Sequence, residues 1–516
     1  MRPVAILALL ATAVGAGCTP TGGRGQRPAT QLRWVSPLAV EAVSPGQVGG
    51  VRWLRATASQ PTRMVVWHDD GEQVRSTEVA PLAVEHEVAF VGFAPGPHQV
   101  WVELVNDAGE RVSSEVVGFD EPGIPGLRVE VLAHDASRVG DGWLLAPLTL
   151  VGDEAPTYVV LLDEALRVAW WADRQGLLAE VQLDGHELVG TGGGALNRLD
   201  LLGHVTDTVV PALGEAHHDL VTLPDGSFWT LVERGVEVDA YPVAYDRLED
   251  FAPARLRDSF VAHVGPDGET LAAVALADLL DTQKIGFNSL DFYPSEQWFD
   301  WNHANGLGID PRDGGPVVSL RHLDAVVKLS ADLQLEWILG APEGWRAPWS
   351  DALLSAAPGL TWPLHPHAPE VLADGTLLLF DNRNDGHTPY TEPVTVRPTS
   401  RAVAYRVDAG RAEQLWSYDT TTTGPLFCAA VGDVDLDDAG RVLVDYGFVH
   451  FEGELDNEDA GRGARSIRWV EGFVEEAVPL LDVRLSTDPA VWPDGVHSYR
   501  VQRVPSRYGP IPAVAP

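Results

Sequence analysis

Three histidines stand at the start of similar strand–turn–strand segments. His218 begins "HDLVTLPDG" and lies eight residues before Gly226, and His367 begins "HAPEVLADG" and lies eight residues before Gly375. His303 begins "HANGLGIDPRDG", which has the same layout with a longer turn. A neutral imidazole can attack an electrophile, move a proton or bind zinc or copper. The repeated spacing therefore predicts one site that contains three imidazoles.

Two polar residues near His303 are candidates for the same site. Arg321 ends the apolar run "PVVSL" and lies eighteen residues after His303, so an antiparallel hairpin would bring it back beside that histidine. Its guanidinium keeps its charge and presents a planar fork of donors that suits a tetrahedral oxyanion. Asn305, two residues after His303, is expected on the same face of the strand. His217, His322 and His365 adjoin these motifs, and side-chain alternation predicts that they face elsewhere.

Two chemistries fit three imidazoles and one guanidinium. Three neutral histidines could hold zinc or copper, although the adjacent permanent cation would repel the metal. Alternatively, one imidazole could attack a sulfuryl or phosphoryl group while the others and Arg321 bind its oxygens or move protons, without metal or cofactor. Charge favours the second chemistry. A metal-dependent hydrolase and a non-catalytic propeller that binds a ligand or glycan remain the alternatives.

The segments around these residues repeat along the chain. From residue 125 onward, six copies of a strand–turn–strand unit, among them "TYVVLLDEALRVAWWAD" and "DAVVKLSADLQLEWILG", are each preceded by a second hairpin or strand. Two hairpins make one four-stranded sheet, and radially repeated sheets protect their own edges. The pattern predicts an all-β, six-bladed β-propeller over 125–516 whose innermost strands bring the three histidines together. A short helix is expected in "LADLLDTQKIGF", and "HSYRVQRV" is expected to return to the first blade.

The amino-terminal region does not contain the repeated unit and has a different pattern of strands and turns. Residues 32–120 contain short alternating strands with Asp-Gly and Pro-Gly turns, and they resemble a fibronectin type III or immunoglobulin-like β-sandwich in architecture. Residues 1–18 combine a basic start with a short apolar run and end at Cys18, which indicates a signal peptide and a lipid-modified cysteine, with plain secretion as the alternative. Residues 19–31 read as a linker. We expect an exported protein, periplasmic or at the cell surface, whose only membrane attachment is the lipid anchor.

The composition limits the partners. The chain has 516 residues and a net charge of −38, which disfavours nucleic acid and anionic lipid. An anionic small substrate would therefore need a local cationic pocket. Cys428 is the only cysteine besides Cys18, so a modified Cys18 leaves no intrachain disulfide.

The three histidine motifs, "HHDLVTLPDG", "DWNHANGLGIDPRDGGPVVSLRHLDAVVKL" and "HAPEVLADGTLLLFDN", are similar, in this order, to those of the bacterial arylsulfate sulfotransferase family. The resemblance covers most of 125–510 and implies a six-bladed propeller that transfers a sulfuryl group from a phenolic sulfate ester to a phenol by a ping-pong route. It implies no nucleotide donor. By motif match His367 would be the nucleophile, and His218, His303 and Arg321 would bind the sulfuryl oxygens and assist proton transfer. Asn305 would be an additional ligand.

The sequence also departs from the family pattern. Pro366 precedes the nucleophilic histidine where relatives often have Gln, and the disulfide found in some members cannot form. The amino-terminal sandwich differs from the usual amino-terminal domain. These departures leave open the physiological donor and acceptor, the activity of the site and the oligomeric state, a homodimer included.

Overall fold

The computed structural model describes residues 31–44, 46–151, 156–174, 180–295, 297–393, 399–450 and 465–511. Within these ranges the chain is almost entirely strand, which confirms the predicted all-β class. One α-helix, α1 (Leu276–Leu279), lies in the predicted helical segment, and two 3-10 turns, η1 (Arg321–Leu323) and η2 (Trp349–Ala352), complete the helical structure of the described part. None of the helices described is long and apolar enough to cross a membrane. The predicted signal segment, Cys18 and the linker up to residue 30 lie outside the described residues.

The amino-terminal strands form one seven-stranded sheet. Its members are β1 (Trp34–Ala42), β3 (Val51–Asp69), β4 (Val74–Val91), β5 (Gly96–Val105), β6 (Arg111–Ser113), β7 (Val117–Glu121) and β37 (Gly509–Pro510). β3 pairs with β1 through its first half and with β5 through its second half, and the ladder with β4 shifts register between Thr57 and Thr62. The sheet therefore continues through β3 and β4 around the core that contains Leu54, Met64 and Phe90. The resemblance to fibronectin III stays a prediction.

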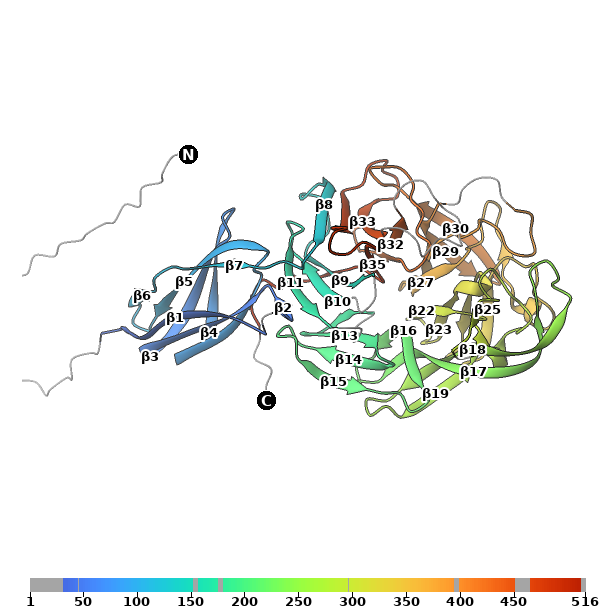
Figure 1. The fold of residues 1–516 in the computed structure, drawn as a ribbon, viewed down its shortest axis with the longest axis horizontal. Helices are drawn as coiled ribbons and strands as arrows, with labels where there is room; N and C mark the ends of the chain where they lie inside the picture. Colours follow the sequence, from blue (N-terminus) through green and yellow to red (C-terminus); the bar gives the residue numbers. More distant parts are fainter. Residues whose placement is uncertain are drawn as a thin grey trace, which may run out of the picture.

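Six further sheets follow along the chain and are arranged as a ring beside the first (Figure 1). The first sheet comprises β2 (Val48–Gly49), β9 (Trp143–Leu150), β10 (Thr157–Leu162), β11 (Val168–Asp173), β35 (Val496–Ser498) and β36 (Gln502–Val504). The second sheet comprises β12 (Gln182–Asp184), β13 (Glu187–Gly192), β14 (Ala195–Leu199) and β15 (Val205–Val209). The third sheet comprises β16 (Glu215–Thr222), β17 (Phe228–Pro242), β18 (Phe251–Val264), β19 (Thr270–Ala275), β20 (Phe292–Tyr293) and β21 (Trp298–Phe299). The fourth sheet comprises β22 (Ala304–Ile309), β23 (Pro316–Leu320), β24 (Ala325–Leu329) and β25 (Leu335–Gly340). The fifth sheet comprises β26 (Ser355–Ala356), β27 (Pro366–Val371), β28 (Thr376–Asp381), β29 (Arg401–Asp408) and β30 (Arg411–Tyr418). The sixth sheet comprises β31 (Asp433–Leu436), β32 (Arg441–His450), β33 (Arg465–Phe473), β34 (Leu481–Thr487) and β8 (Leu127–His134). This arrangement is propeller-like, as predicted. Each of the six sheets is a separate ladder, and no strand pairing among the described residues closes the ring, so the count of six blades stays a prediction.

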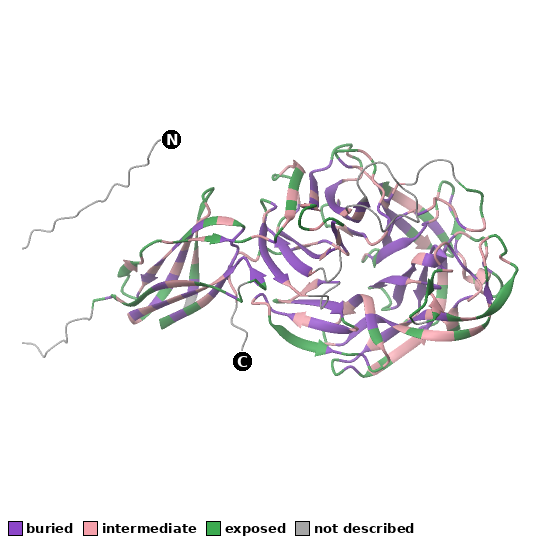
Figure 2. Cartoon of the chain, viewed as in Figure 1, coloured by how far each residue is buried: buried purple, intermediate pink, exposed green. Residues whose placement is uncertain are grey.

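Apolar side chains fill the space between neighbouring sheets. Leu231 and Val261 of the third sheet pack in one buried cluster with Leu307 and Val318 of the fourth. The sixth sheet shares a cluster with the first in the same way. Figure 2 shows that buried residues dominate the inner parts of the strands, whereas exposed residues gather at the periphery. Burial of this apolar surface supplies the main driving force for the packing of the sheets.

The terminal segments join the amino-terminal sheet to the ring. β2 pairs with β11, and β37 pairs with β4. Just before β37 in the chain, β35 and β36 pair with β9. The carboxy-terminal segment therefore completes the first sheet of the ring, as predicted from "HSYRVQRV". The Tyr508 hydroxyl lies 3.1 Å from Nδ1 of the buried His68, which fixes the end of this segment against the amino-terminal sheet.

The innermost strands surround one cavity of about 340 Å³. All six ring sheets contribute to its lining, through Gln182, Val221, Leu307, Ala368, Asp433 and Gln502. Residues at equivalent positions of these strands therefore face a common centre, although they are far apart in the sequence.

Candidate functional site

The structure brings the three predicted histidines together on neighbouring inner strands, with His303 and His367 at the starts of β22 and β27 and His218 in the middle of β16. The rings of His218 and His303 are 5.1 Å apart between centroids, in a T-shaped contact. The ring of Tyr499 lies between the other pair, 4.8 Å from His367 and 6.0 Å from His218. The three imidazoles and one tyrosine thus form a single aromatic cluster, which we call the histidine cluster.

Each of these strands departs from regular geometry at its histidine motif. The ladders are irregular between His217 and Leu220, between Ala304 and Gly306, and between His367 and Glu370. Positive φ angles accompany the irregularities, at 57° for His218, 42° for His303 and 47° for Ala368. A left-handed backbone costs on the order of 1–3 kcal/mol for a non-glycine residue, and several such residues close together often accompany a functional site. The strands therefore share a local device that turns their histidines toward the centre.

His367 is held in one tautomer. Its Nδ1 lies 2.7 Å from the backbone carbonyl oxygen of Gly432, which can only accept, so Nδ1 carries the proton. Nε2 then keeps its lone pair. Burial, together with the positive charge of Arg500, lowers the pKa of His367 to about 3. The imidazole is consequently neutral and nucleophilic at neutral pH.

His218 is bonded to its chain neighbour. The Nδ1 atoms of His217 and His218 are 2.6 Å apart, so one of them donates to the other. Burial lowers the pKa of both rings, that of His217 to about 3. The pair is therefore neutral at neutral pH.

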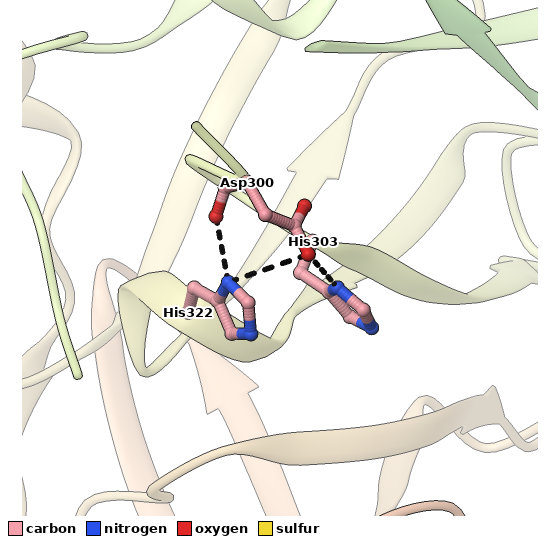
Figure 3. A group of neighbouring side chains, drawn as sticks. All are labelled: Asp300, His303 and His322. Carbon is pink, nitrogen blue, oxygen red and sulfur yellow. Dashed lines mark hydrogen bonds and ion pairs between the residues drawn. The ribbon is translucent and has the colours of Figure 1, made fainter. Parts of the chain in front are cut away.

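A chain of hydrogen bonds links His303 through Asp300 and His322 to Arg321, and Figure 3 shows its first three members. His303 Nδ1 donates to the side chain of Asp300 over 2.5 Å, and His322 Nδ1 donates to the backbone carbonyl of the same aspartate over 2.7 Å. Arg321 Nη1 donates to His322 Nε2 over 2.7 Å, and the rings of His322 and His303 stack at 4.5 Å. Burial opposes ionisation of Asp300, yet His303 and His322 hold its pKa below the ordinary range, so its carboxylate is charged.

Two buried donors at these motifs have no hydrogen-bond partner among the described residues. One is Nε of Arg321, whose Nη2 donates to the carbonyl of Ala429. The other is Nδ2 of Asn305, whose Oδ1 accepts from Ser319. A buried donor without a partner loses the free energy of its hydrogen bond to water. Both groups are thus suited to bind the oxygens of an anion.

A second cation lies beside the cluster. The Arg500 side chain is 16% exposed and donates to Asp219 over 2.9 Å, and its Nε lies 3.2 Å from Glu180 and 3.6 Å from Asp433. Asp219 follows His218 directly and also accepts from the backbone N–H of Leu307 over 2.8 Å. Arg500 is thereby neutralised by its own carboxylates, whereas Arg321 contacts only uncharged acceptors among its hydrogen-bond partners.

The same region contains the one group of described residues whose spacing would suit a metal ion, Asp300, His303 and His322. Their ligand atoms lie within 4.8 Å of one another. His322 has no lone pair to offer, because Nδ1–H donates to a carbonyl and Nε2 accepts from Arg321. The guanidinium would also repel a cation. The hydrogen bonds favour an anion-binding arrangement over a metal site.

The sequence-based interpretation of the neighbouring histidines is wrong for two of them. His217 and His322 do not face elsewhere, because they contact His218 and His303 directly. Side-chain alternation fails here since the ladder is irregular after His217 and His322 lies in η1 rather than in a strand. His365 Nε2 lies 3.2 Å from the Asn288 side chain, and its ring centroid is 6.2 Å from that of His322.

Three further residues of the site were not anticipated. Tyr499 and Arg500 come from the carboxy-terminal segment, which has no histidine motif, and Asp300 comes from an insertion in the third sheet. The Asp-x-x-His spacing of "DWNH" was the only available signal for Asp300.

A ring of sheets that gathers imidazoles and a guanidinium at its centre defines an all-β, propeller-like protein. The chain belongs to the arylsulfotransferase (ASST) family, whose model matches residues 130–478. This match confirms the resemblance seen in the histidine motifs.

Individual relatives are more distant. Arylsulfate sulfotransferase AssT of Escherichia coli O6:H1 is 29% identical over 138 residues, and AssT of Lelliottia amnigena is 28% identical over the same length. Each match spans 23% of this chain and 23% of the relative. Among solved structures, a protein of unknown function from Bacteroides caccae is 14% identical with a TM-score of 0.39, covering 70% of this chain and 100% of that one. Virginiamycin B lyase from Staphylococcus aureus is 8% identical with a TM-score of 0.31, covering 70% and 99%.

Proposed function

We propose that this protein transfers a sulfuryl group from an aryl sulfate ester to a phenol through a covalent intermediate on His367. The observation that carries the proposal is the fixed tautomer of His367, which leaves the lone pair on Nε2 of a ring that belongs to the histidine cluster through Tyr499. Membership of the arylsulfotransferase family supports the reaction type.

In the first half-reaction, the lone pair of His367 Nε2 attacks the sulfur atom of the ester. The bond from sulfur to the phenolic oxygen breaks, and its electron pair leaves on that oxygen as a phenolate, which takes a proton from solvent or from a neighbouring imidazole that already carries an extra proton. Nδ1–H of His367 stays bonded to the Gly432 carbonyl, which stabilises the positive charge that develops on the ring. The product is an N-sulfonated histidine and a free phenol.

In the second half-reaction, an acceptor phenol gives its proton to a neighbouring imidazole and attacks the same sulfur atom. The bond from Nε2 to sulfur breaks, and His367 regains its lone pair. His218 and His303 are the proposed proton carriers, because both rings adjoin the site. Arg321 and Asn305 are proposed to bind the sulfuryl oxygens through their unpartnered donors. No cofactor or metal is required by these steps.

Activity and the covalent adduct are tested together. The protein is incubated with 4-nitrophenyl sulfate and a panel of phenols while release of 4-nitrophenolate is followed. A mixture quenched before the acceptor is added should carry about 80 Da, the mass of SO3, on the peptide that contains His367. His367→Asn should abolish both signals. His263→Gln is the control, since His263 contacts Trp229 and Ser227 rather than the histidine cluster.

Three outcomes would reject the proposal. Release of 4-nitrophenolate that does not depend on the phenol would indicate a hydrolase, and stoichiometric zinc or copper in the active protein would indicate the metal-dependent alternative. A protein that binds glycans without any turnover would indicate the non-catalytic alternative.

We also propose export and a lipid anchor at Cys18, from the sequence of residues 1–18. Aryl sulfates and phenols outside the cytoplasm would then be the substrates. Cys18→Ser should release the protein from the membrane fraction, and unchanged membrane association of this variant would argue against the anchor.

A further inference from the structure

Asp300 accepts hydrogen bonds from two histidines of the site, His303 and His322. Its side chain accepts from Nδ1 of His303, and its main-chain carbonyl accepts from Nδ1 of His322. His322 in turn accepts from Arg321. One residue therefore orients two imidazoles, as Figure 3 shows, and through the second of them the guanidinium of Arg321.

The position of Asp300 is itself fixed by the insertion that precedes it. The side chain of Asp300 is 2% exposed. Its backbone N–H donates to the carbonyl of Asp291 over 3.0 Å, and β21, which ends one residue earlier, pairs with β18 at Leu256. Arg257 of β18 places Nη1 4.0 Å from the Asp300 carboxylate. Such support from several elements is needed to hold a reacting group in place.

Among the three histidines of the proposed reaction, only His303 has a carboxylate at Nδ1. His367 has the neutral Gly432 carbonyl and His218 has the His217 ring. A carboxylate fixes the tautomer with Nε2 free, and it stabilises the imidazolium that forms when Nε2 takes a proton. A carbonyl fixes the tautomer with a weaker electrostatic effect.

We infer that Asp300 is a positioning residue that makes His303 the proton carrier for the phenols and holds Arg321 through His322. This inference rests on the proposed sulfuryl transfer. It distinguishes His303 from His218, which the chemistry of the reaction alone does not do.

The test compares Asp300→Asn with the wild-type protein over phenol acceptors of increasing pKa. Asn keeps the size of the side chain and removes the charge. We expect kcat to fall by about 10²-fold for the least acidic phenols, by much less for the most acidic ones, and KM to change by less than about threefold. Asp300→Glu should recover about tenfold of this loss. A purely structural role would lower the activity equally for all acceptors.

A matched control is available in the second sheet. Asp200 is also buried and accepts from Nδ1 of a histidine, His204, over 3.1 Å, but it lies outside the site. Asp200→Asn should leave transfer unchanged. Should Asp300→Asn fold poorly, the coupling can be measured with His303→Gln, in whose background the loss of the carboxylate should cost less than about threefold.

The outcomes separate the two proposals. An inactive wild-type protein would remove the proposed function and this inference with it. An active protein in which Asp300→Asn acts like the control, or costs the same with and without His303, would overturn the inference alone. Zinc that is bound stoichiometrically and lost in Asp300→Asn would assign the same residues to a metal and would overturn it as well.

Discussion

The carbonyl oxygen of Gly432 lies 2.7 Å from Nδ1 of His367, and the two residues come from neighbouring sheets. This contact determines which nitrogen of the proposed nucleophile is free. The backbone of Gly432 has φ 106°, and a Cβ atom at this position would lie 2.4 Å from the Phe380 ring. The contact thus depends on the absence of a side chain at residue 432.

Gly432→Ala should therefore lower both stability and activity. The added methyl group would clash with Phe380 and displace the carbonyl from His367, and we expect a loss of about 1–3 kcal/mol in unfolding free energy and at least tenfold in kcat. Urea unfolding and the transfer assay measure the two effects. Gly440→Ala is the control, because Gly440 also has a positive φ, at 82°, but its added methyl group would meet no atom of the described residues within 4 Å. Equal effects of both substitutions on kcat would contradict the proposed role of the contact.

Arg321→Lys should reduce transfer although it keeps the charge. A lysine cannot contact His322 and the Ala429 carbonyl at once while offering a further donor to a sulfuryl oxygen. We expect kcat/KM to fall by about 10²-fold. Arg312→Lys, which changes a half-exposed arginine paired with Asp310 in the same sheet, should have no effect. Full activity of Arg321→Lys would show that a charge alone suffices.

Tyr499→Phe separates the hydroxyl of the central tyrosine from its ring. The hydroxyl donates to the backbone carbonyl of Asn305, whereas the ring packs on His367 and His218. Loss of the hydroxyl should cost about 1 kcal/mol of stability with a small change in kcat. Tyr499→Ala should cost about 3–5 kcal/mol and most of the activity, because it opens a cavity beside the nucleophile. Thermal unfolding and the transfer assay compare the two variants; a larger loss from Tyr499→Phe would mean that the hydroxyl takes part in the reaction.

Asp258 should make stability depend on pH. Burial raises its pKa to about 7, although Asn302 and the N–H of Ala277 bond to it. The folded state thus retains a proton that the unfolded state releases above about pH 4, so the contribution of this residue is lost as pH rises toward 7. Asp258→Asn lacks this titration. The unfolding free energy of the variant relative to wild type should increase between about pH 4.5 and pH 7.5. A difference that does not change with pH would contradict the raised pKa of Asp258 in the folded protein.

The sequence predicted the repeated parts of the fold better than the irregular ones. Alternating apolar residues and Asp-Gly turns locate nearly every hairpin of the ring, and the spacing of His218, His303 and His367 brought them to one centre. Alternation could not predict the side on which His217 and His322 lie, because the backbone leaves the strand conformation there. Arg500 and Tyr499 carry no local signal, since they reach the centre only through the long-range pairing of β35 and β36 with β9.

This pairing has a consequence for biosynthesis. The segment that completes the first sheet and supplies Tyr499 and Arg500 is the last part of the described chain to be translated. A nascent polypeptide that stops before residue 496 would leave β9 with an unpaired edge and the histidine cluster without its central aromatic ring. The first sheet and the histidine cluster would then be complete only after residues 496–504 have been made and have paired with β9.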